Sequence, residues 1–169
     1  MKGMSLVSLG AAASLMLVAG CASNADSSAS IDDQASSRVG GESGGPVPGS
    51  MEDFVVNAGN RVFYAFDRYD LSSDAQATLQ RQAAWLNSYP ATSVRVEGNC
   101  DERGTREYNL ALGARRANAA KDYLVGLGVD PARISTISYG KERPIDPRST
   151  DEAWALNRNA TTVIAEAGL

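Results

Sequence analysis

The sequence predicts an α+β domain in which helices pack on one face of a mixed four-stranded sheet. Three observations support this: aromatic or β-branched runs typical of strands, runs with apolar residues at helical spacing, and the alternation of the two kinds. The expected order is β-α-β-α-β-(α)-β over residues 51–169, which is the order of a two-layer sandwich.

The first predicted elements are a strand and a helix. The run RVFYAF at 61–66 is rich in aromatic and β-branched residues, as strands are. A helix with Ser72 or Ser73 as its N-cap should run from 74 to about 89, where Pro90 stops it. The candidates for its core-facing positions are Leu79, Ala83, Trp85 and Leu86.

The next run joins a strand, a polar turn and a long helix. The strand alternates Val94 and Val96 with charged residues and is expected to break at Gly98. The helix should begin near Glu107 and end at Gly126. Its residues at helical spacing, expected to face the core, are Leu110, Ala114, Ala117, Ala120 or Lys121, and Leu124.

The C-terminal part predicts three short elements after a turn at 130–133. The run 134–139 has the composition of a strand, 151–157 that of a brief helix, and 160–165 that of a last strand. These elements complete the four strands of the predicted sheet.

Composition and charge exclude several classes of function. The net charge of −4 and the pI of about 4.8 argue against a nucleic-acid partner, because phosphate binding requires a basic face. The chain contains no histidine, so His-based acid–base catalysis, Ser-His or Cys-His triads and His-ligated metals are all excluded. No cofactor is predicted.

The candidate site is a pair of opposite charges. Asp101 lies in the loop between the second strand and the long helix, and Arg115 and Arg116 lie further along that helix. A loop carboxylate and a helix guanidinium can face each other across a small pocket. Such a pocket suits a zwitterion, because Arg binds a carboxylate in a two-pronged geometry and Asp holds an ammonium. No nucleophile accompanies these residues, so the pattern indicates binding.

Residues 1–20 are interpreted as a secretory signal, because a short positive start precedes an apolar run of about 16 residues, short for a membrane span of about 20. The run ends in LVAG before Cys21, which resembles a lipobox; an ordinary signal peptide with a chance cysteine is the alternative. The resemblance implies cleavage before Cys21 and its acylation, and stable anchoring needs more than one acyl chain. Ala22, in place of the Asp of inner-membrane lipoproteins, favours the outer membrane.

Residues 21–50 are predicted to form an acylated cysteine followed by a flexible linker. From Ala22 to Ser50 the composition is mainly Ser, Ala, Gly and Asp with no aromatic residue, so little apolar surface can be buried there. As a random coil these 29 residues span on the order of 30 Å, and about 95 Å when extended. A lipid-anchored domain on such a linker can reach a layer set back from the membrane.

Several motifs of the folded part carry a family resemblance. They are Val96-Glu97-Gly98, Asp101-Glu102-Arg103-Gly104, Tyr108-Asn109, Leu112-Gly113-Ala114-Arg115-Arg116-Ala117-Asn118-Ala119 and Ser138-Tyr139-Gly140-Lys141-Glu142-Arg143-Pro144. In order and spacing they resemble the OmpA-like peptidoglycan-binding domain family, and more narrowly the peptidoglycan-associated lipoproteins of Gram-negative outer membranes. The resemblance covers about residues 62–163 and implies an OmpA-like fold.

The resemblance implies roles for the two opposite charges. Asp101 matches the residue that binds the ammonium of diaminopimelate, the zwitterionic amino acid of the peptidoglycan stem peptide. Its alternative roles are to cap the following helix or to pair with Arg103. Arg116 matches the carboxylate-binding arginine, with a solvated helix charge as the alternative, and Arg115 fits that alternative as well as it fits a role in the site.

Other candidate site residues match the family at the edge of the first strand, in the loop and on the helix. Leu112 is a candidate for the pocket wall, with an ordinary core contact as the alternative. Either Asp67 or Asp70 is expected to line the pocket. The full predicted set is Phe66, Asp67, Asp70, Asn99, Asp101, Leu112, Arg115 and Arg116.

Two departures from the family pattern bear on this site. Asn99-Cys100 stands where the family usually has His-Ala, and Asn cannot titrate near neutral pH, so the pH dependence is expected to differ. With Cys21 acylated, Cys100 is the remaining thiol, and it is expected to be buried and inert or to form a disulfide-linked dimer, with burial favoured. The second departure is at 157–159, where the family tends to have two arginines, and no role is assigned there.

The resemblance implies a non-catalytic tether between the outer membrane and peptidoglycan. It also implies a TolB-like β-propeller as a periplasmic partner, within a Tol-Pal system that acts in envelope constriction at division. Two alternatives stay open. One is a structural lipoprotein with a degenerate pocket that acts through protein partners, and the other is a cell-wall hydrolase with Asp101 and Glu102 as its acid–base pair.

Overall fold

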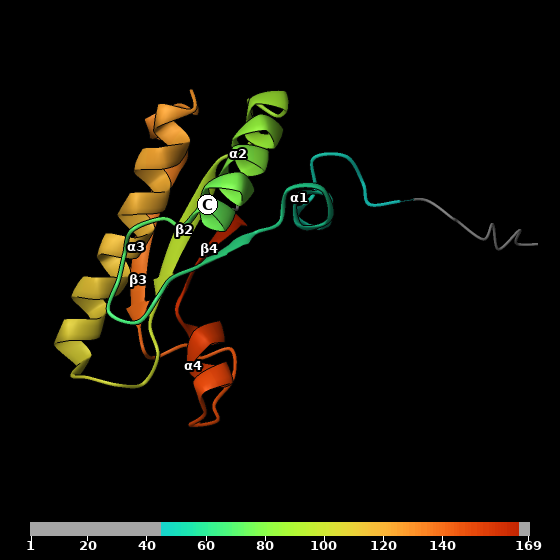
Figure 1. Ribbon diagram of the computed structural model, residues 1–169. Coiled ribbons are helices and arrows are strands. Elements are labelled where there is room, and N and C mark those ends of the chain that lie inside the picture. Colours follow the sequence, from blue (N-terminus) through green and yellow to red (C-terminus); the bar gives the residue numbers. More distant parts are fainter. Residues whose placement is uncertain (1–44, 166–169) are drawn as a thin grey trace, which may run out of the picture. The chain divides into compact units, whose positions relative to one another are not determined.

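The computed structural model describes residues 45–165 (Figure 1). The predicted signal segment, Cys21 and most of the predicted linker lie outside the described residues. Within the described range no helix is long and apolar enough to cross a membrane.

Four strands form one mixed sheet in the order β1-β4-β2-β3. Strand β4 is antiparallel to both of its neighbours, β1 and β2, whereas β2 and β3 run parallel. In the central register, Val96 of β2 pairs with Thr136 of β3 and Thr162 of β4. The strands are β1 (Arg61–Phe63), β2 (Val94–Asn99), β3 (Ile134–Gly140) and β4 (Asn159–Ile164). The predicted mixed four-stranded sheet is confirmed.

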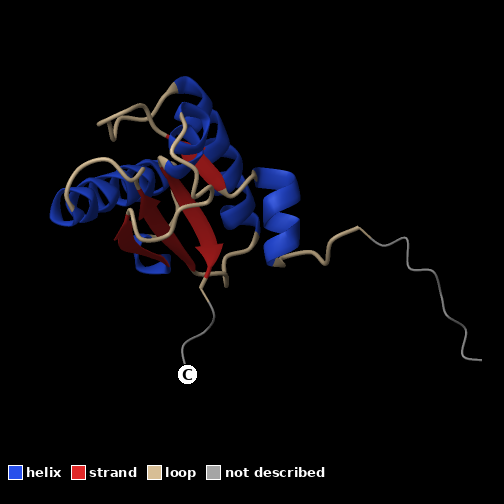
Figure 2. Ribbon diagram, turned by 90° about the horizontal axis from the view of Figure 1, so that it is seen from below, coloured by secondary structure: helices blue, strands red, loops and turns tan. Residues whose placement is uncertain are grey.

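Two long helices cover one face of this sheet (Figures 1 and 2). They are α2 (Ser73–Ser88) and α3 (Arg106–Gly126). Each begins at a hydroxyl cap, because Ser72 accepts a hydrogen bond from the N–H of Ala75 and Thr105 accepts one from the N–H of Tyr108. The predicted α+β arrangement, with its helices on one face, is therefore confirmed.

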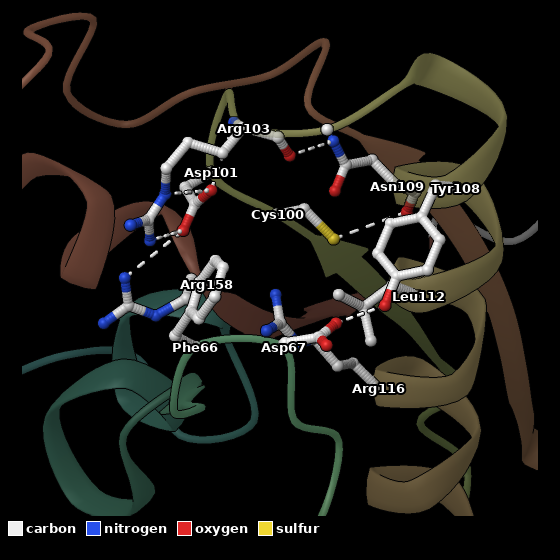
Figure 3. A pocket seen from close by; sticks show the side chains of 11 residues that line it. Phe66, Asp67, Cys100, Asp101, Arg103, Tyr108, Asn109, Leu112, Arg116 and Arg158 are labelled. Carbon is white, nitrogen blue, oxygen red and sulfur yellow. Dashed lines mark hydrogen bonds and ion pairs between the residues drawn. The ribbon is translucent and has the colours of Figure 1, made fainter.

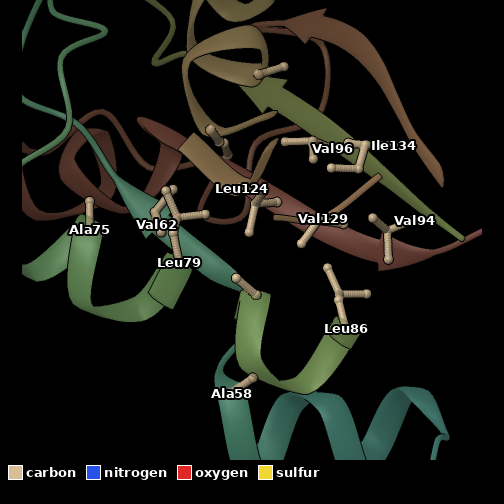
Figure 4. Close-up of a cluster of buried hydrophobic side chains, with 14 of the residues drawn as sticks. Ala58, Val62, Ala75, Leu79, Leu86, Val94, Val96, Leu124, Val129 and Ile134 are labelled. Atoms are coloured by element: carbon tan, nitrogen blue, oxygen red, sulfur yellow. The ribbon is translucent and has the colours of Figure 1, made fainter. Parts of the chain in front are cut away.

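The apolar core fills the layer between these helices and the sheet (Figure 4). The alternating positions Val94 and Val96 of β2 point into it, as the period of a strand requires. Leu79, Leu86 and Leu124 contribute from the two helices and are fully buried. Burial of a single side chain of this size stabilises the fold by about 1.5–3 kcal/mol.

Three shorter elements complete the fold: α1 (Met51–Ala58), the 3-10 helix η1 (Pro131–Arg133) and α4 (Asp151–Asn157). The brief helix predicted at 151–157 is confirmed, whereas α1 was not predicted. Asp53 joins α1 to α2, because its carboxylate accepts hydrogen bonds from the N–H of Gly49 and from the indole Nε1–H of Trp85, both at 2.9 Å.

Three sequence predictions about the elements are wrong. Strand β1 ends at Phe63 instead of residue 66, because the chain turns away towards Asp67. Strand β2 does not break at Gly98 but continues to Asn99, with a register shift between these two residues. Leu110 is exposed although it was expected in the core, because the buried positions in this part of α3 are those in phase with Leu112.

Glycines bring β2 and α3 into direct backbone contact. A Cβ atom added at Gly98 would lie 1.8 Å from the carbonyl oxygen of Gly113, and one at Gly113 would lie 2.3 Å from Oγ of Ser138. Only a residue without a side chain fits at this crossing. The contact sets the position of α3 over the end of β2, where the candidate site lies.

Candidate ligand-binding pocket

A pocket of about 170 Å³ lies where β2 ends and α3 begins, beside α4 and the loop after β1 (Figure 3). Its lining comes from four separate segments of the chain. The residues are Phe66, Asp67, Cys100, Asp101, Arg103, Gly104, Tyr108, Asn109, Leu112, Arg116 and Arg158. The predicted pair Asp101 and Arg116 therefore lines one cavity.

Arg116 is a fully buried guanidinium. Its Nε–H donates to the carbonyl oxygen of Arg68 at 2.8 Å, and Nη1–H donates to that of Asn99 at 2.8 Å. Nη2–H donates to the carbonyl of Ala65 at 3.2 Å, and no carboxylate of the described residues forms an ion pair with this guanidinium. Burial lowers the pKa of Arg116, as expected for a cation removed from water without an anion beside it.

Asp101 is buried but well paired. Its carboxylate accepts hydrogen bonds from Arg103, at 2.6 Å for Nη2 and 3.1 Å for Nε, and from Nη1 of Arg158 at 3.3 Å. Burial by itself raises the pKa of this carboxyl, but the hydrogen bonds from Arg103 and Arg158 outweigh it and lower the pKa below its ordinary value. Asp101 is therefore ionised throughout the physiological range.

Arg103 lies between two aromatic rings at the mouth of the pocket. The carbon Cζ of its guanidinium is 4.2 Å from the ring centroid of Phe66 and 4.2 Å from that of Trp154. The indole Nε1–H of Trp154 in turn donates to Oε1 of Glu102 at 2.9 Å, which fixes the ring. Two aromatic faces and the Asp101 carboxylate thus hold one guanidinium.

Asp67 closes the opposite side of the pocket. It has a φ of +56°, the left-handed region that a non-glycine residue rarely adopts, and it receives a hydrogen bond from the hydroxyl of Tyr108. Such conformations cluster where a side chain must be aimed at a ligand. The contact joins the loop after β1 to the first turn of α3 across the cavity.

One family model and several known proteins match this chain. Residues 63–158 match the family model described as the OmpA family. The chain belongs to the OmpA family. A peptidoglycan-associated lipoprotein of Agrobacterium fabrum is 53% identical over 129 residues, which cover 76% of this chain and 73% of that protein. One of Mesorhizobium japonicum is 48% identical over 155 residues, which cover 91% of this chain and 89% of that protein.

A solved structure agrees with this assignment. The crystal structure of the peptidoglycan-associated lipoprotein from Burkholderia pseudomallei matches with a TM-score of 0.62 and 41% sequence identity. The match covers 70% of this chain and 96% of that one. The resemblance to OmpA-like domains and to peptidoglycan-associated lipoproteins that the sequence motifs indicated is confirmed.

The pocket of this OmpA-family domain contains five of the eight predicted site residues. These are Phe66, Asp67, Asp101, Leu112 and Arg116. Of the two alternatives left open in the loop after β1, Asp67 lines the cavity. Asp101 also takes its alternative role, because it pairs with Arg103.

Three predicted residues do not line this pocket. Asp70 is exposed and pairs with Arg68 outside the cavity. Asn99 is buried on the other side of β2, where its Nδ2 donates to Oδ1 of Asn159 at 3.0 Å. Arg115 is exposed on α3, as its solvated alternative predicts, whereas the next residue, Arg116, is buried.

Six lining residues of the OmpA-family pocket were not in the predicted set: Cys100, Arg103, Gly104, Tyr108, Asn109 and Arg158. Arg103 was considered only as a partner of Asp101, and Tyr108 and Asn109 were quoted only for the resemblance. Arg158 was given no role, yet it reaches Asp101 from the junction of α4 and β4. The departure at 157–159 was the only signal in this region of the sequence.

Cys100 is buried in the pocket wall, which confirms the favoured expectation for this thiol. Its Sγ donates to the carbonyl oxygen of Asn109 at 3.3 Å. Burial raises the pKa of Cys100 above its ordinary value, so the thiol stays neutral and unreactive near neutral pH.

Affinity of the pocket for a zwitterion should be independent of pH between about 5 and 8. The chain has no histidine, the pKa of Asp101 lies below its ordinary range, and that of Cys100 lies above its ordinary range. Because only the ionised Asp101 attracts an ammonium, binding should weaken only in acid, below the ordinary titration range of an aspartate, as the pH falls through the lowered pKa. Calorimetric titration with diaminopimelate across this pH range measures the dissociation constant. A tenfold change in that constant between pH 5 and 8 would contradict the assignment of the pocket.

Proposed function

We propose that this chain is an outer-membrane lipoprotein whose folded domain faces the periplasm and binds peptidoglycan non-covalently. It would thereby tether the outer membrane to the cell wall. Its relatives are named peptidoglycan-associated lipoproteins, and they share about half of its residues over most of its length. We further propose that the ligand is the diaminopimelate of the stem peptide, which ends in an ammonium and a carboxylate.

The observation that carries this proposal is the buried guanidinium of Arg116. A fully buried cation with no carboxylate partner among residues 45–165 is costly, and an incoming anion would compensate it. Asp101 and Asp67 line the same cavity and supply negative charge for an ammonium. A pocket with a buried cation and nearby carboxylates suits a zwitterion, bound by charge-assisted hydrogen bonds.

The anchor belongs to this proposal and rests on the sequence. Residues 1–20 would be the signal peptide, residues 21–50 the acylated Cys21 with its linker, and residues 51–169 the peptidoglycan-binding domain. A linker that spans on the order of 30 Å as a coil gives the domain access to a wall layer away from the membrane.

The partners follow from the same proposal. We propose a TolB-like β-propeller that competes with peptidoglycan for the domain, within a Tol-Pal system acting in envelope integrity and constriction at division. These roles rest on the family resemblance and go beyond the pocket itself.

A cell-wall hydrolase is disfavoured by the charges around its candidate acid–base pair. A general acid needs a raised pKa, whereas hydrogen bonds from Arg103 and Arg158 outweigh burial and lower the pKa of Asp101. Hydrogen bonds from Ser149 and Trp154 likewise lower the pKa of Glu102. Neither carboxyl would retain a proton to donate at neutral pH.

A degenerate pocket is disfavoured by the positions of the two departing residues. Asn99 turns towards Asn159 and does not line the cavity, and Cys100 contributes only a neutral, buried wall. The charged groups that would bind the ligand are all in place. These positions support the proposal that the departure from His-Ala leaves the binding chemistry of the pocket unchanged.

Co-sedimentation with purified sacculi tests the proposed function. The full chain carrying Cys21→Ser, which removes the acyl anchor, should pellet with diaminopimelate-containing sacculi and be released by millimolar diaminopimelate. A TolB-like partner should release it as well. If this protein stays in the supernatant while folded by circular dichroism, peptidoglycan binding is wrong. If it pellets but diaminopimelate does not release it, the ligand assignment is wrong.

A further inference from the structure

We infer that Arg103 occupies the position on Asp101 that the ammonium of a ligand would take. Arg103 is on this account an internal competitor that must move aside before the ligand can reach the carboxylate. The inference rests on the proposed function and adds a residue that sets the affinity and the selectivity of the same site.

The first observation is how completely Arg103 covers the carboxylate. Oδ1 of Asp101 accepts from the backbone N–H and from Nε–H of Arg103, at 3.2 and 3.1 Å, and Oδ2 accepts from its Nη2–H at 2.6 Å. Arg158 adds a longer contact of 3.3 Å to Oδ2. A ligand ammonium needs the same oxygens, so it competes directly with the guanidinium of Arg103.

The second observation is that hydrogen bonds hold the backbone around Arg103, whereas its side chain is partly exposed. The carbonyl of Arg103 accepts a hydrogen bond from Nδ2 of Asn109 at 2.9 Å. Nζ of Lys141 donates to the carbonyls of Glu102 and Gly104, at 3.1 and 2.8 Å, which holds the loop on both sides of Arg103. The Arg103 side chain is 34% exposed, against 5% for that of Asp101.

The third observation concerns the groups beside Arg103 that could contact its guanidinium after displacement from Asp101. The ring centroids of Phe66 and Trp154 each lie 4.2 Å from Cζ of Arg103, so a guanidinium displaced from Asp101 would still have aromatic faces to stack on. Glu102, which anchors Trp154, borders the same stack and offers a carboxylate there. Arg158 would remain on Oδ2 and keep Asp101 oriented for the ligand.

Competition of this kind has a distinctive consequence for mutants. Removing an ordinary ligand contact weakens binding, whereas removing an internal competitor strengthens it. An ion pair whose arginine is one-third exposed is worth at most about 1 kcal/mol, so the expected gain in affinity is about two- to fivefold. The gain should be confined to ligands that carry an ammonium, because only they use the vacated position on Asp101.

Calorimetric titrations of the full Cys21→Ser chain, with and without Arg103→Ala, test the inference. Diaminopimelate should bind Arg103→Ala about two- to fivefold more tightly, whereas pimelate, which has both carboxylates but no amine, should bind no more tightly. Arg95→Ala is the matched control, since Arg95 pairs with Glu97 outside the pocket and is 45% exposed. It should leave both affinities unchanged.

Tryptophan fluorescence provides an independent readout of the displacement. The chain has two tryptophans; Trp85 is buried in the core, and Trp154 stacks on Arg103. Diaminopimelate should change the emission of the parent chain. The change should be absent from Trp154→Phe, which removes the reporting indole, and from Arg103→Ala.

The outcomes separate this inference from the proposed function. If the parent chain binds diaminopimelate and Arg103→Ala binds it equally or more weakly, Arg103 is a ligand contact or a bystander and the inference is wrong. Equal tightening for pimelate would also overturn it. If the parent chain binds neither sacculi nor diaminopimelate, the proposed function and the inference fail together.

Discussion

Replacing Arg116 with methionine should abolish diaminopimelate binding, with a loss on the order of a hundredfold or more. The guanidinium is fully buried and is the one proposed to take the ligand's carboxylate. Methionine fills a similar volume without the charge, so the two-pronged contact is lost while much of the packing is kept. Calorimetric titration and co-sedimentation with sacculi measure the effect.

Arg115→Ala is the matched control for this prediction. The two arginines are adjacent in the sequence, but Arg115 is exposed and outside the pocket, so its removal should leave binding within about twofold. Because Arg116 also binds the carbonyls of Ala65, Arg68 and Asn99, each variant is first compared with the parent by thermal unfolding. A folded Arg116→Met protein that still binds diaminopimelate with near-parental affinity would refute the assignment of this residue.

Gly98→Ala should destabilise the domain by at least about 3 kcal/mol, the upper range for overpacking a rigid site. The new methyl group would lie 1.8 Å from the carbonyl oxygen of Gly113, and this obstacle is helix backbone rather than a side chain that can rotate. Relief requires α3 to move away from β2, which would also separate Asp101 from Arg116. Urea unfolding followed by circular dichroism measures the loss.

Gly126→Ala is the corresponding control. This glycine lies in the last turn of α3, where an added Cβ meets no atom within 4 Å. Alanine there should change the free energy of unfolding by no more than about 1 kcal/mol, and in the stabilising direction, because alanine is the better helix former. Equal losses from both substitutions would show that the clash at Gly98 is not the cause.

The sheet and the two long helices could be predicted because their signals are local. The capping residues, the alternating valines of β2 and the proline after α2 each act within a few residues of the chain. Helix α1 was missed because Phe54, Val55 and Val56 are consecutive apolar residues with no helical spacing. Only Phe54 is buried, and its partner Trp85 lies on another helix, with ring centroids 4.9 Å apart.

The phase of α3 could not be read from hydrophobicity, because half of its inner face lines a pocket. The buried positions there are Asn109, Leu112, Gly113 and Arg116, and most of these are polar or small. A search for apolar residues at helical spacing therefore selected Leu110, which is exposed. Where a helix lines a binding site, its inward-facing residues include polar ones that suit a ligand. The spacing of its apolar residues then does not identify its buried face.

The two central charges of the site, Asp101 and Arg116, could be predicted because they lie close together in the sequence, on one loop and on the helix that follows it. Arg158 could not, because it lies 57 residues from Asp101 and depends on how α4 and β4 return to the end of β2. The same holds for Trp154, whose contact with Arg103 exists only once α4 is folded against the loop. Long-range arrangement, rather than composition, completes this pocket.

Strand β1 also determines how the proposed tether would respond to mechanical load. Tension from the membrane anchor would enter the domain at α1 and β1 and leave through the pocket on β2 and α3. The ladder between β1 and β4 is three residues long and that between β2 and β4 is five, so β1 should separate from the sheet before β2 does. Peeling would release about 3.3 Å of chain per residue while the ligand stays held. Separation of the shortest strand would thus relieve tension on the domain while the proposed peptidoglycan-binding pocket stays intact.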